Sequence, residues 1–171
     1  MWLDTSKRAD RRESERSATQ TSISNRTEAQ LAVRRLEVID QAIAKGVIKV
    51  PVGRKLDVLV IAPYSRQVEE LSRRLASAKL KYLTVEVLSV DAVQGRECDL
   101  AVFSVTRSNA RSEFGFLGQP YWRRINVALS RARFGLTIVG DAAFCRSTPG
   151  ALRDVLDYMR SHPEECEIRD A

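Results

Sequence analysis

The sequence predicts an α/β domain in which helices cover both faces of a mainly parallel sheet. Short runs of consecutive apolar residues alternate with longer segments in which apolar residues recur every three or four positions. The first pattern is typical of strands buried on both faces, and the second is typical of amphipathic helices. Strands that alternate with helices join into parallel sheets through right-handed crossovers.

The apolar runs predict four strands, at residues 58–62, 85–90, 100–105 and 136–139. Pro63 ends the first of them, because proline cannot donate to the next rung of a sheet. The segment before it, residues 47–57, contains Pro51 and Gly53 and is expected to be a connection.

Four helices are expected around these strands. The side chain of Asn25 can cap the first one, with Glu28 in a box-like position three residues later, and Gly46 can end it. Ser65 can cap the second helix, and the others are expected near residues 122–132 and 151–160. The residues of the first helix that should face the core are Ala29, Ala32, Leu36, Ile39 and Ile43.

Composition limits the class of protein. The 171 residues suit one domain, and a hydrophobic content of 44% is enough for one core. The net charge of +6 favours a polyanionic partner. Cys98, Cys145 and Cys166 lack CxxC spacing and His162 is the only histidine, which argues against a disulfide framework or zinc site. No apolar stretch approaches the roughly 20 residues that cross a bilayer, so an intracellular protein, cytoplasmic or nuclear, is expected.

Charge patterning suggests three parts. Residues 1–21 mix basic and acidic side chains with few apolar ones, and are expected to be disordered or a linker. Residues 22–161 carry the strand and helix patterns and form the folded domain. Residues 162–171 are expected to be a charged tail.

Two polar blocks are candidates for chemistry. In SVDAVQGRECD, residues 89–99, a glycine lies among amide, guanidinium and carboxylate groups just after an apolar run, which suits a loop whose backbone approaches a phosphate. In INVALSRAR, residues 125–133, arginines lie beside apolar positions that can pack one side of a helix. Arginine can bind phosphate oxygens with two parallel hydrogen bonds. Each block alone is equally compatible with an ordinary polar loop or a solvated helix face.

The expected sheet suggests where a site would lie. Ligands of such sheets bind beyond the carboxyl ends of the strands. Tyr64, residues 94–97 and the loop after Val105 each come after a strand. We therefore expect the polar motifs to converge on one edge of the sheet.

Four segments in this order resemble the second RecA-like domain of superfamily 1 helicases of the up-frameshift type, which include senataxin. SISNRTEAQ at residues 22–30 is similar to the first segment of that domain, and VIAPYSRQ at residues 60–67 to motif IV. SVDAVQGRECD is similar to motif V, and RRINVALSRARFGLTIVGD at residues 123–141 to motif VI with its following strand. The resemblance implies a RecA-like, P-loop NTPase type three-layer α/β/α sandwich.

The resemblance also implies a nucleotide site. Tyr64 would stack on adenine, with Gln67 beside it, and Glu97 would bind the ribose hydroxyls. The backbone of Gly95 would lie near the terminal phosphate. Arg131 would be the arginine finger, a catalytic residue that stabilises charge on the γ-phosphate.

Other interpretations of these residues stay open. Tyr64 could simply pack at the end of a strand, and Glu97 could form a salt bridge to Arg96 or Arg131. Capping alone would account for Asn25 and Glu28.

The resemblance further implies a partner, single-stranded RNA or DNA. Ser89 and Asp91 lie in the part of motif V that touches the nucleic-acid backbone in relatives. Arg107 could reach either nucleotide or nucleic acid, or could be a solvated loop arginine.

The chain departs from the family pattern in what it lacks. It has no GxxxxGK[ST] loop and no Asp-Glu pair after a strand. The resemblance implies that a first RecA-like domain, in cis or in trans, would provide both, so that ATP with Mg²⁺ would bind between the two domains. Ser130 stands where threonine is usual, and Tyr121 and Trp122 are extra residues that could displace the start of the motif VI helix.

Two functions fit these patterns. The first is the second motor domain of an ATP-dependent helicase, which would be inactive alone. The alternative is a stand-alone, non-catalytic RecA-like module that binds nucleic acid or a partner, a possibility suggested by the initial Met1 and the charged ending SHPEECEIRDA. The presence of Glu97 and Arg131 favours the motor.

Overall fold

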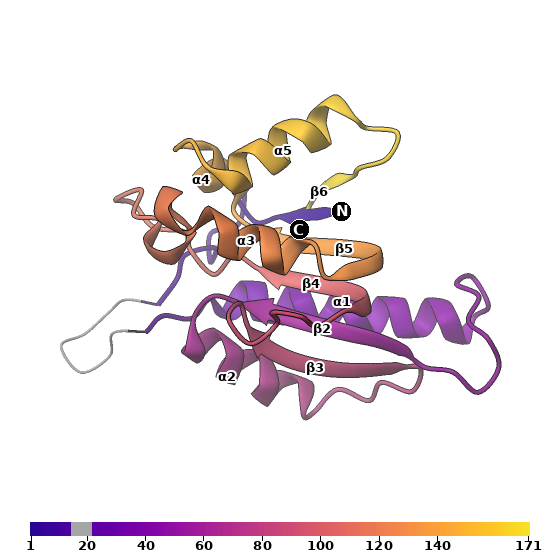
Figure 1. Ribbon diagram of the computed structural model, residues 1–171. Coiled ribbons are helices and arrows are strands. Elements are labelled where there is room, and N and C mark those ends of the chain that lie inside the picture. Colours follow the sequence, from indigo (N-terminus) through magenta and orange to yellow (C-terminus); the bar gives the residue numbers. More distant parts are fainter. Residues whose placement is uncertain (15–21) are drawn as a thin grey trace.

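A computed structural model describes residues 1–14 and 22–171 as one parallel six-stranded sheet between two layers of helices. The strand order is β3-β2-β4-β5-β1-β6, and every pair is parallel (Figure 1). The strands are β1 Trp2–Asp4, β2 Leu56–Ala62, β3 Leu83–Ser89, β4 Cys98–Ser104, β5 Ala132–Gly140 and β6 Ile168–Asp170. The predicted RecA-like α/β/α sandwich and all four predicted strands are therefore confirmed.

Two apolar clusters hold the layers together. Helices α1 Arg26–Ala44 and α2 Ser65–Leu75 cover one face, where all five predicted core residues of α1 are buried. Helices α3 Trp122–Leu129, α4 Ala142–Arg146 and α5 Ala151–Ser161 cover the other. Alternate strand residues supply the two cores, because successive side chains of a strand point to opposite faces: Val58 and Val60 lie in the α1–α2 core, Leu59 and Ile61 in the other.

The N-terminal segment belongs to the sheet. Trp2 is fully buried, its Nε1 donates a hydrogen bond of 2.9 Å to Gly140 O, and β1 lies between β5 and β6. The expectation that residues 1–21 are disordered or a linker is wrong for residues 1–14, because one buried tryptophan in a three-residue strand escapes a criterion based on charge. Residues 15–21 of that expectation lie outside the described residues.

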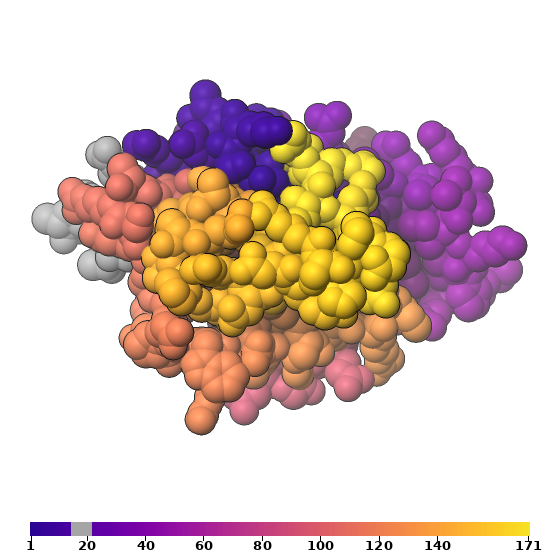
Figure 2. Space-filling model, turned by 90° about the horizontal axis from the view of Figure 1, so that it is seen from above, coloured from indigo at the N-terminus to yellow at the C-terminus, as the bar shows by residue number. Residues whose placement is uncertain are grey.

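The C-terminal segment also differs from the expectation. Within the predicted charged tail at residues 162–171, β6 pairs with β1, with Trp2 opposite Ile168. Figure 2 shows these two ends of the chain, in indigo and yellow, lying side by side. The tail is charged, but it also completes the edge of the sheet.

Helix ends follow the sequence in part. Asn25 Oδ1 accepts a hydrogen bond of 3.1 Å from Glu28 N, so the predicted cap of α1 is confirmed. The predicted cap at Ser65 is wrong, because Ser65 is the first residue of α2, and Tyr64 holds the cap position without a capping hydrogen bond from its side chain. Helix α3 starts at Trp122, after the short 3-10 turns Gly115–Leu117 and Gln119–Tyr121, and ends early because β5 begins at Ala132.

We expect Trp2→Ala to lower the free energy of unfolding by about 3–5 kcal/mol, because it removes a fully buried indole together with its hydrogen bond to Gly140 O. Urea denaturation measures this change. Trp122→Ala is the matched control, since Trp122 is 47% exposed and should cost far less. Equal losses in the two variants would show that β1 is not an integral strand.

Candidate functional site

One group of predicted site residues lies at the carboxyl ends of the strands. Tyr64 follows β2, Asp91 follows β3 and Arg107 follows β4. The Arg107 guanidinium carbon is 6.0 Å from the centre of the Tyr64 ring. Arg124 of α3 joins the group, with its Nε 3.4 Å from Asp91 Oδ1. We call these four residues the carboxyl-edge cluster.

A second group lies at the amino ends. Gly95 and Glu97 precede β4, and Arg131 precedes β5, where Cys98 N donates to Arg131 O at 3.0 Å. Arg133 Nη2 lies 2.7 Å from Glu97 Oε2. We call Gly95, Glu97, Arg131 and Arg133 the amino-edge cluster.

The expectation that all polar motifs meet at one edge is therefore wrong. Strands β3 and β4 are both parallel to β2, one on either side of it. The chain from Val90 to Glu97 must therefore return along the sheet, so that Gly95 and Glu97 come before β4 instead of following β3. The seven residues of β4 separate the two edges by roughly 20 Å.

This separation bears on the predicted nucleotide site. Tyr64 follows β2 and Glu97 precedes β4, so the two residues lie at opposite edges of the sheet. Their contacts with one adenosine stay a prediction. Tyr64 is 3% exposed and packs at the end of its strand, with Phe116 at a ring-centre distance of 5.6 Å.

Gln67 is a structural residue. It is fully buried, and its Nε2 donates to Asn25 O at 3.1 Å and to Ser104 Oγ at 2.9 Å. Its Oε1 accepts from Asn25 N at 2.7 Å. Both ends of the amide bind the protein interior in this structure, and the expected nucleotide contact of Gln67 stays a prediction.

Glu28 organises the interior beside the carboxyl edge. It is fully buried, and its Oε2 accepts hydrogen bonds of 2.7 Å from both Thr106 N and Ser104 Oγ. Its Oε1 accepts from Asn25 Nδ2 at 3.1 Å. Thus Glu28 does more than cap: it ties α1 to the loop after β4.

The same carboxylate holds a strained residue. Thr106 has a φ of 71°, a left-handed conformation that is unfavourable for a β-branched residue.

Burial raises the pKa of Glu28 to about 8, although the hydrogen bonds from Thr106 and Ser104 favour the charged form.

Arg107 is enclosed, with 2% of its surface exposed. Its Nη1 donates to Glu13 Oε1 at 2.5 Å, and Glu13 Oε2 also accepts from Ser108 N at 2.6 Å. The alternative of a solvated loop arginine is therefore wrong, and a contact of Arg107 with nucleotide or nucleic acid stays a prediction. Sequence reasoning missed Glu13, because nothing distinguishes it from the other acids of a mixed-charge segment.

Arg131 is held by neutral oxygens. Its Nε donates to Val127 O at 2.6 Å, and its two Nη atoms donate to Ser130 Oγ at 2.8 Å and Arg96 O at 3.2 Å. Among the described residues, no carboxylate forms an ion pair with it. The guanidinium is therefore oriented without being neutralised, which suits contact with an anion.

The other charged groups near Arg131 have partners. Glu97 pairs with Arg133, which is neither of the two partners that the sequence suggested, and this hydrogen bond lowers the pKa of Glu97. Arg96 pairs with Glu86. Gly95 has a φ of +74°, and a side chain there would meet no other atom, so the backbone of this loop is open to a ligand.

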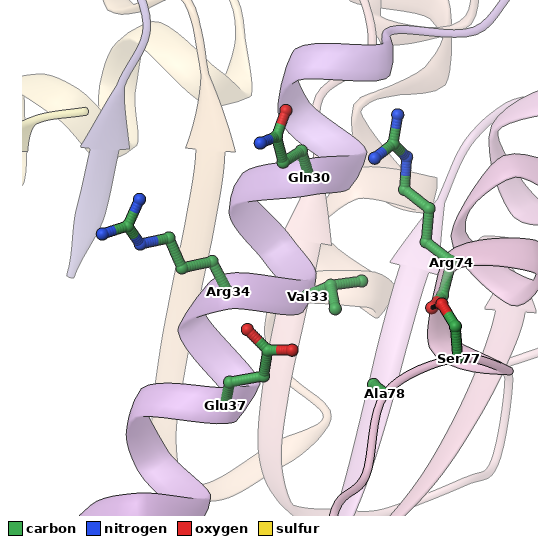
Figure 3. Close-up of a pocket in the computed structure, with 7 residues that line it drawn as sticks. All are labelled: Gln30, Val33, Arg34, Glu37, Arg74, Ser77 and Ala78. Carbon is green, nitrogen blue, oxygen red and sulfur yellow. Dashed lines mark hydrogen bonds between the residues drawn. The ribbon is translucent and has the colours of Figure 1, made fainter.

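A hollow on the α1–α2 face of the sheet carries no predicted site residue. Figure 3 shows it between α1 and the end of α2, with Val33 and Glu37 on the side facing α2 and Arg34 pointing away. Arg74 Nε donates to Glu70 Oε1 at 2.6 Å along its own helix. This hollow belongs to the packing surface of the two helices.

Over the described parts of the chain, no helix has the length and apolar character needed to cross a membrane.

We expect the stability of the protein to fall between about pH 4.5 and pH 8 because of Glu28. The pKa of Glu28 is raised on folding, so at these pH values the unfolded chain loses a proton that the native state keeps, and the free energy of unfolding decreases as pH rises. Glu28→Gln should remove up to about 1.4 kcal/mol of this decrease per pH unit. Urea denaturation across the pH range tests this, with Glu37→Gln on the exposed side of α1 as control. Identical pH slopes for wild type and Glu28→Gln would contradict the prediction.

Comparison with known proteins agrees with this architecture. A family model described as an AAA domain matches residues 1–143. Regulator of nonsense transcripts 1 homolog of Arabidopsis thaliana is 37% identical over 156 residues, which are 89% of this chain and 11% of that protein.

Two further relatives are named for DNA. DNA-binding protein SMUBP-2 of Mesocricetus auratus is 38% identical over 108 residues, 63% of this chain and 10% of that protein. DNA polymerase alpha-associated DNA helicase A of Saccharomyces cerevisiae is 38% identical over 108 residues, 63% of this chain and 14% of that protein. The chain thus spans only 10% to 14% of these three relatives. It belongs to the AAA domain family, as a helicase domain of the up-frameshift type.

Proposed function

We propose that this domain is the second motor domain of an ATP-dependent RNA or DNA helicase and that Arg131 is its arginine finger. The observation that carries the proposal is the state of the Arg131 guanidinium, which three neutral oxygens orient while its charge stays unpaired among the described residues. A preorganised cation of this kind stabilises charge that develops on a phosphoryl group without reorganising during the reaction.

The amino-edge cluster is the part of the domain that would face ATP. Glu97 would exchange its contact with Arg133 for the ribose hydroxyls, and the open backbone at Gly95 would approach the terminal phosphate. A first RecA-like domain, in cis or in trans, would supply the phosphate loop and the Mg²⁺ ligands. Within residues 1–14 and 22–171, no group of three His, Cys, Asp or Glu side chains could hold a metal ion.

The carboxyl edge would carry single-stranded RNA or DNA. Asp91 has 69% of its side chain exposed, and Ser89 ends β3 beside it. A carboxylate repels phosphates, so Asp91 would accept a hydrogen bond from a sugar hydroxyl or a base amino group instead. In this arrangement ATP and nucleic acid occupy opposite edges of one domain.

A non-catalytic RecA-like binding module is the second candidate. One observation favours it: Glu97 is already paired with Arg133, so its carboxylate is not free in this structure. The uncompensated charge of Arg131 favours the motor, because a module that only binds nucleic acid at the carboxyl edge does not require that charge at the amino edge.

In the longer protein that contains both motor domains, we expect Arg131→Ala to lower the kcat for ATP hydrolysis about a thousandfold or more, with a small change in KM, because the finger acts in the transition state. Steady-state ATPase assays with saturating single-stranded nucleic acid measure this. Arg153→Ala on the surface of α5 is the control and should leave kcat unchanged. A loss of only a few fold would exclude the finger role.

The isolated 171-residue chain should hydrolyse ATP negligibly, since its sequence has no phosphate-binding GxxxxGK[ST] loop. A sensitive phosphate-release assay on the purified chain checks this. Robust turnover that Arg131→Ala abolishes would show that this chain holds a complete ATPase site.

A further inference from the structure

Three aromatic rings line one hollow at the carboxyl edge. The hollow has a volume of about 580 Å³, and its walls include Tyr64, Phe116 and Tyr121. The Phe116 ring centre is 5.6 Å from that of Tyr64 and 5.5 Å from that of Tyr121. The rings therefore form a continuous row rather than three separate contacts.

The rings differ in what they offer a ligand. Tyr64 is 3% exposed, whereas Phe116 is 45% and Tyr121 is 36% exposed. Neighbouring exposed aromatic rings beside a hollow are a costly surface unless a ligand covers them. Tyr64 thus supports the row from beneath, and the two outer rings can receive a ligand.

Buried groups fix the position of Phe116. Its N donates to the Tyr64 hydroxyl at 3.3 Å. The preceding Gly115 has a φ of +52°, and a Cβ there would lie 2.7 Å from the same hydroxyl, so only glycine lets the backbone approach this closely. The guanidinium of Arg107, held by Glu13, lies 6.0 Å from the Tyr64 ring centre. The platform is therefore preorganised.

One arginine, Arg124, lies against both exposed rings. The guanidinium carbon of Arg124 is 5.9 Å from the Phe116 ring centre and 5.4 Å from that of Tyr121. Two exposed rings with one arginine against them suit a ligand with flat rings and negative charges, which is the chemistry of a nucleotide or a nucleic acid. The adjacent Asp91, 3.4 Å from Arg124, belongs to the proposed strand contact.

The place of the hollow in the fold favours a nucleic acid over a free nucleotide as the ligand. The amino-edge cluster, where ATP is proposed to bind, lies roughly 20 Å away across the strands. We propose that Phe116 and Tyr121 form a stacking site for one unpaired base of a single-stranded nucleic acid. The proposal rests on the proposed binding of a strand to this edge, and names the residues that take its base. Stacking of this kind tolerates any base, because every base has a π-face.

Binding of a fluorescent single-stranded oligothymidylate to the 171-residue chain, followed by anisotropy at low salt, tests the site. Phe116→Ala should weaken binding about 5- to 150-fold, the range expected for one lost base–aromatic stack. Phe116→Tyr keeps the ring and should bind like wild type. Phe134→Ala is the control, because Phe134 is 73% exposed on β5 and does not line the hollow, so its loss should change nothing.

Two further ligands identify what the rings bind. A strand with abasic sites should bind wild type and Phe116→Ala equally, because it keeps the phosphates and lacks the bases. AMP, which has a single base and a single phosphate, should displace the labelled oligothymidylate only at a far higher concentration than an unlabelled strand does.

The outcomes separate this site from the proposed function. Equal binding of oligothymidylate by wild type and Phe116→Ala would overturn the stacking site while leaving strand binding in place. AMP binding that depends on Phe116, together with strand binding that does not, would assign the rings to a free nucleotide and overturn the proposal. If wild type bound no strand even at low salt, both the stacking site and the proposed nucleic-acid track would fall.

Discussion

The return of the chain between two parallel strands determines how this domain is organised. Because β3 and β4 point the same way on either side of β2, the segment from Val90 to Glu97 must run back along the sheet, and it does so without a helix. Asp91 consequently lies at one edge, and Gly95 and Glu97 lie at the other. A single motif thereby reaches both edges, which a motif that simply followed a strand could not do.

Two buried ion and hydrogen-bond networks stabilise the carboxyl edge. Glu28 accepts from Thr106 N and holds the strained residue that turns the chain out of β4. The next residue, Arg107, pairs with Glu13 of the N-terminal segment. Removing Glu13 would leave the buried charge of Arg107 without its closest partner, and removing Glu28 would leave Thr106 N and Ser104 Oγ without their acceptor. Both networks therefore fix this loop more firmly than its irregular backbone suggests. The rigid support for the exposed rings comes from these polar contacts and not only from apolar packing.

The sequence was sufficient for features set by local pattern and insufficient for those set by distant contacts. The apolar runs located four strands, and the spacing from Ala29 to Ile43 identified the buried side of α1. Sequence reasoning missed strand β1, because its stability depends on one tryptophan that donates a hydrogen bond to Gly140 O far along the chain. It also missed Glu13 and Phe116, because their contacts with Arg107 and Tyr64 join segments that are far apart in the sequence. The division of the site between two edges was predictable in principle, because the chain must return along the sheet between two consecutive parallel strands.

Helix α3 is one physical connection between the two edges. Arg124 in its first turn contacts Asp91 and the exposed rings, and Arg131 just beyond its last turn points its guanidinium at the amino-edge loop through Arg96 O. Eight helical residues span about 12 Å and move as one rigid unit. A displacement of Arg131 toward a phosphate would therefore shift Arg124 and the surface beside Phe116. In a motor, the same helix would let ATP hydrolysis at the amino edge change the contacts with a single-stranded nucleic acid at the carboxyl edge.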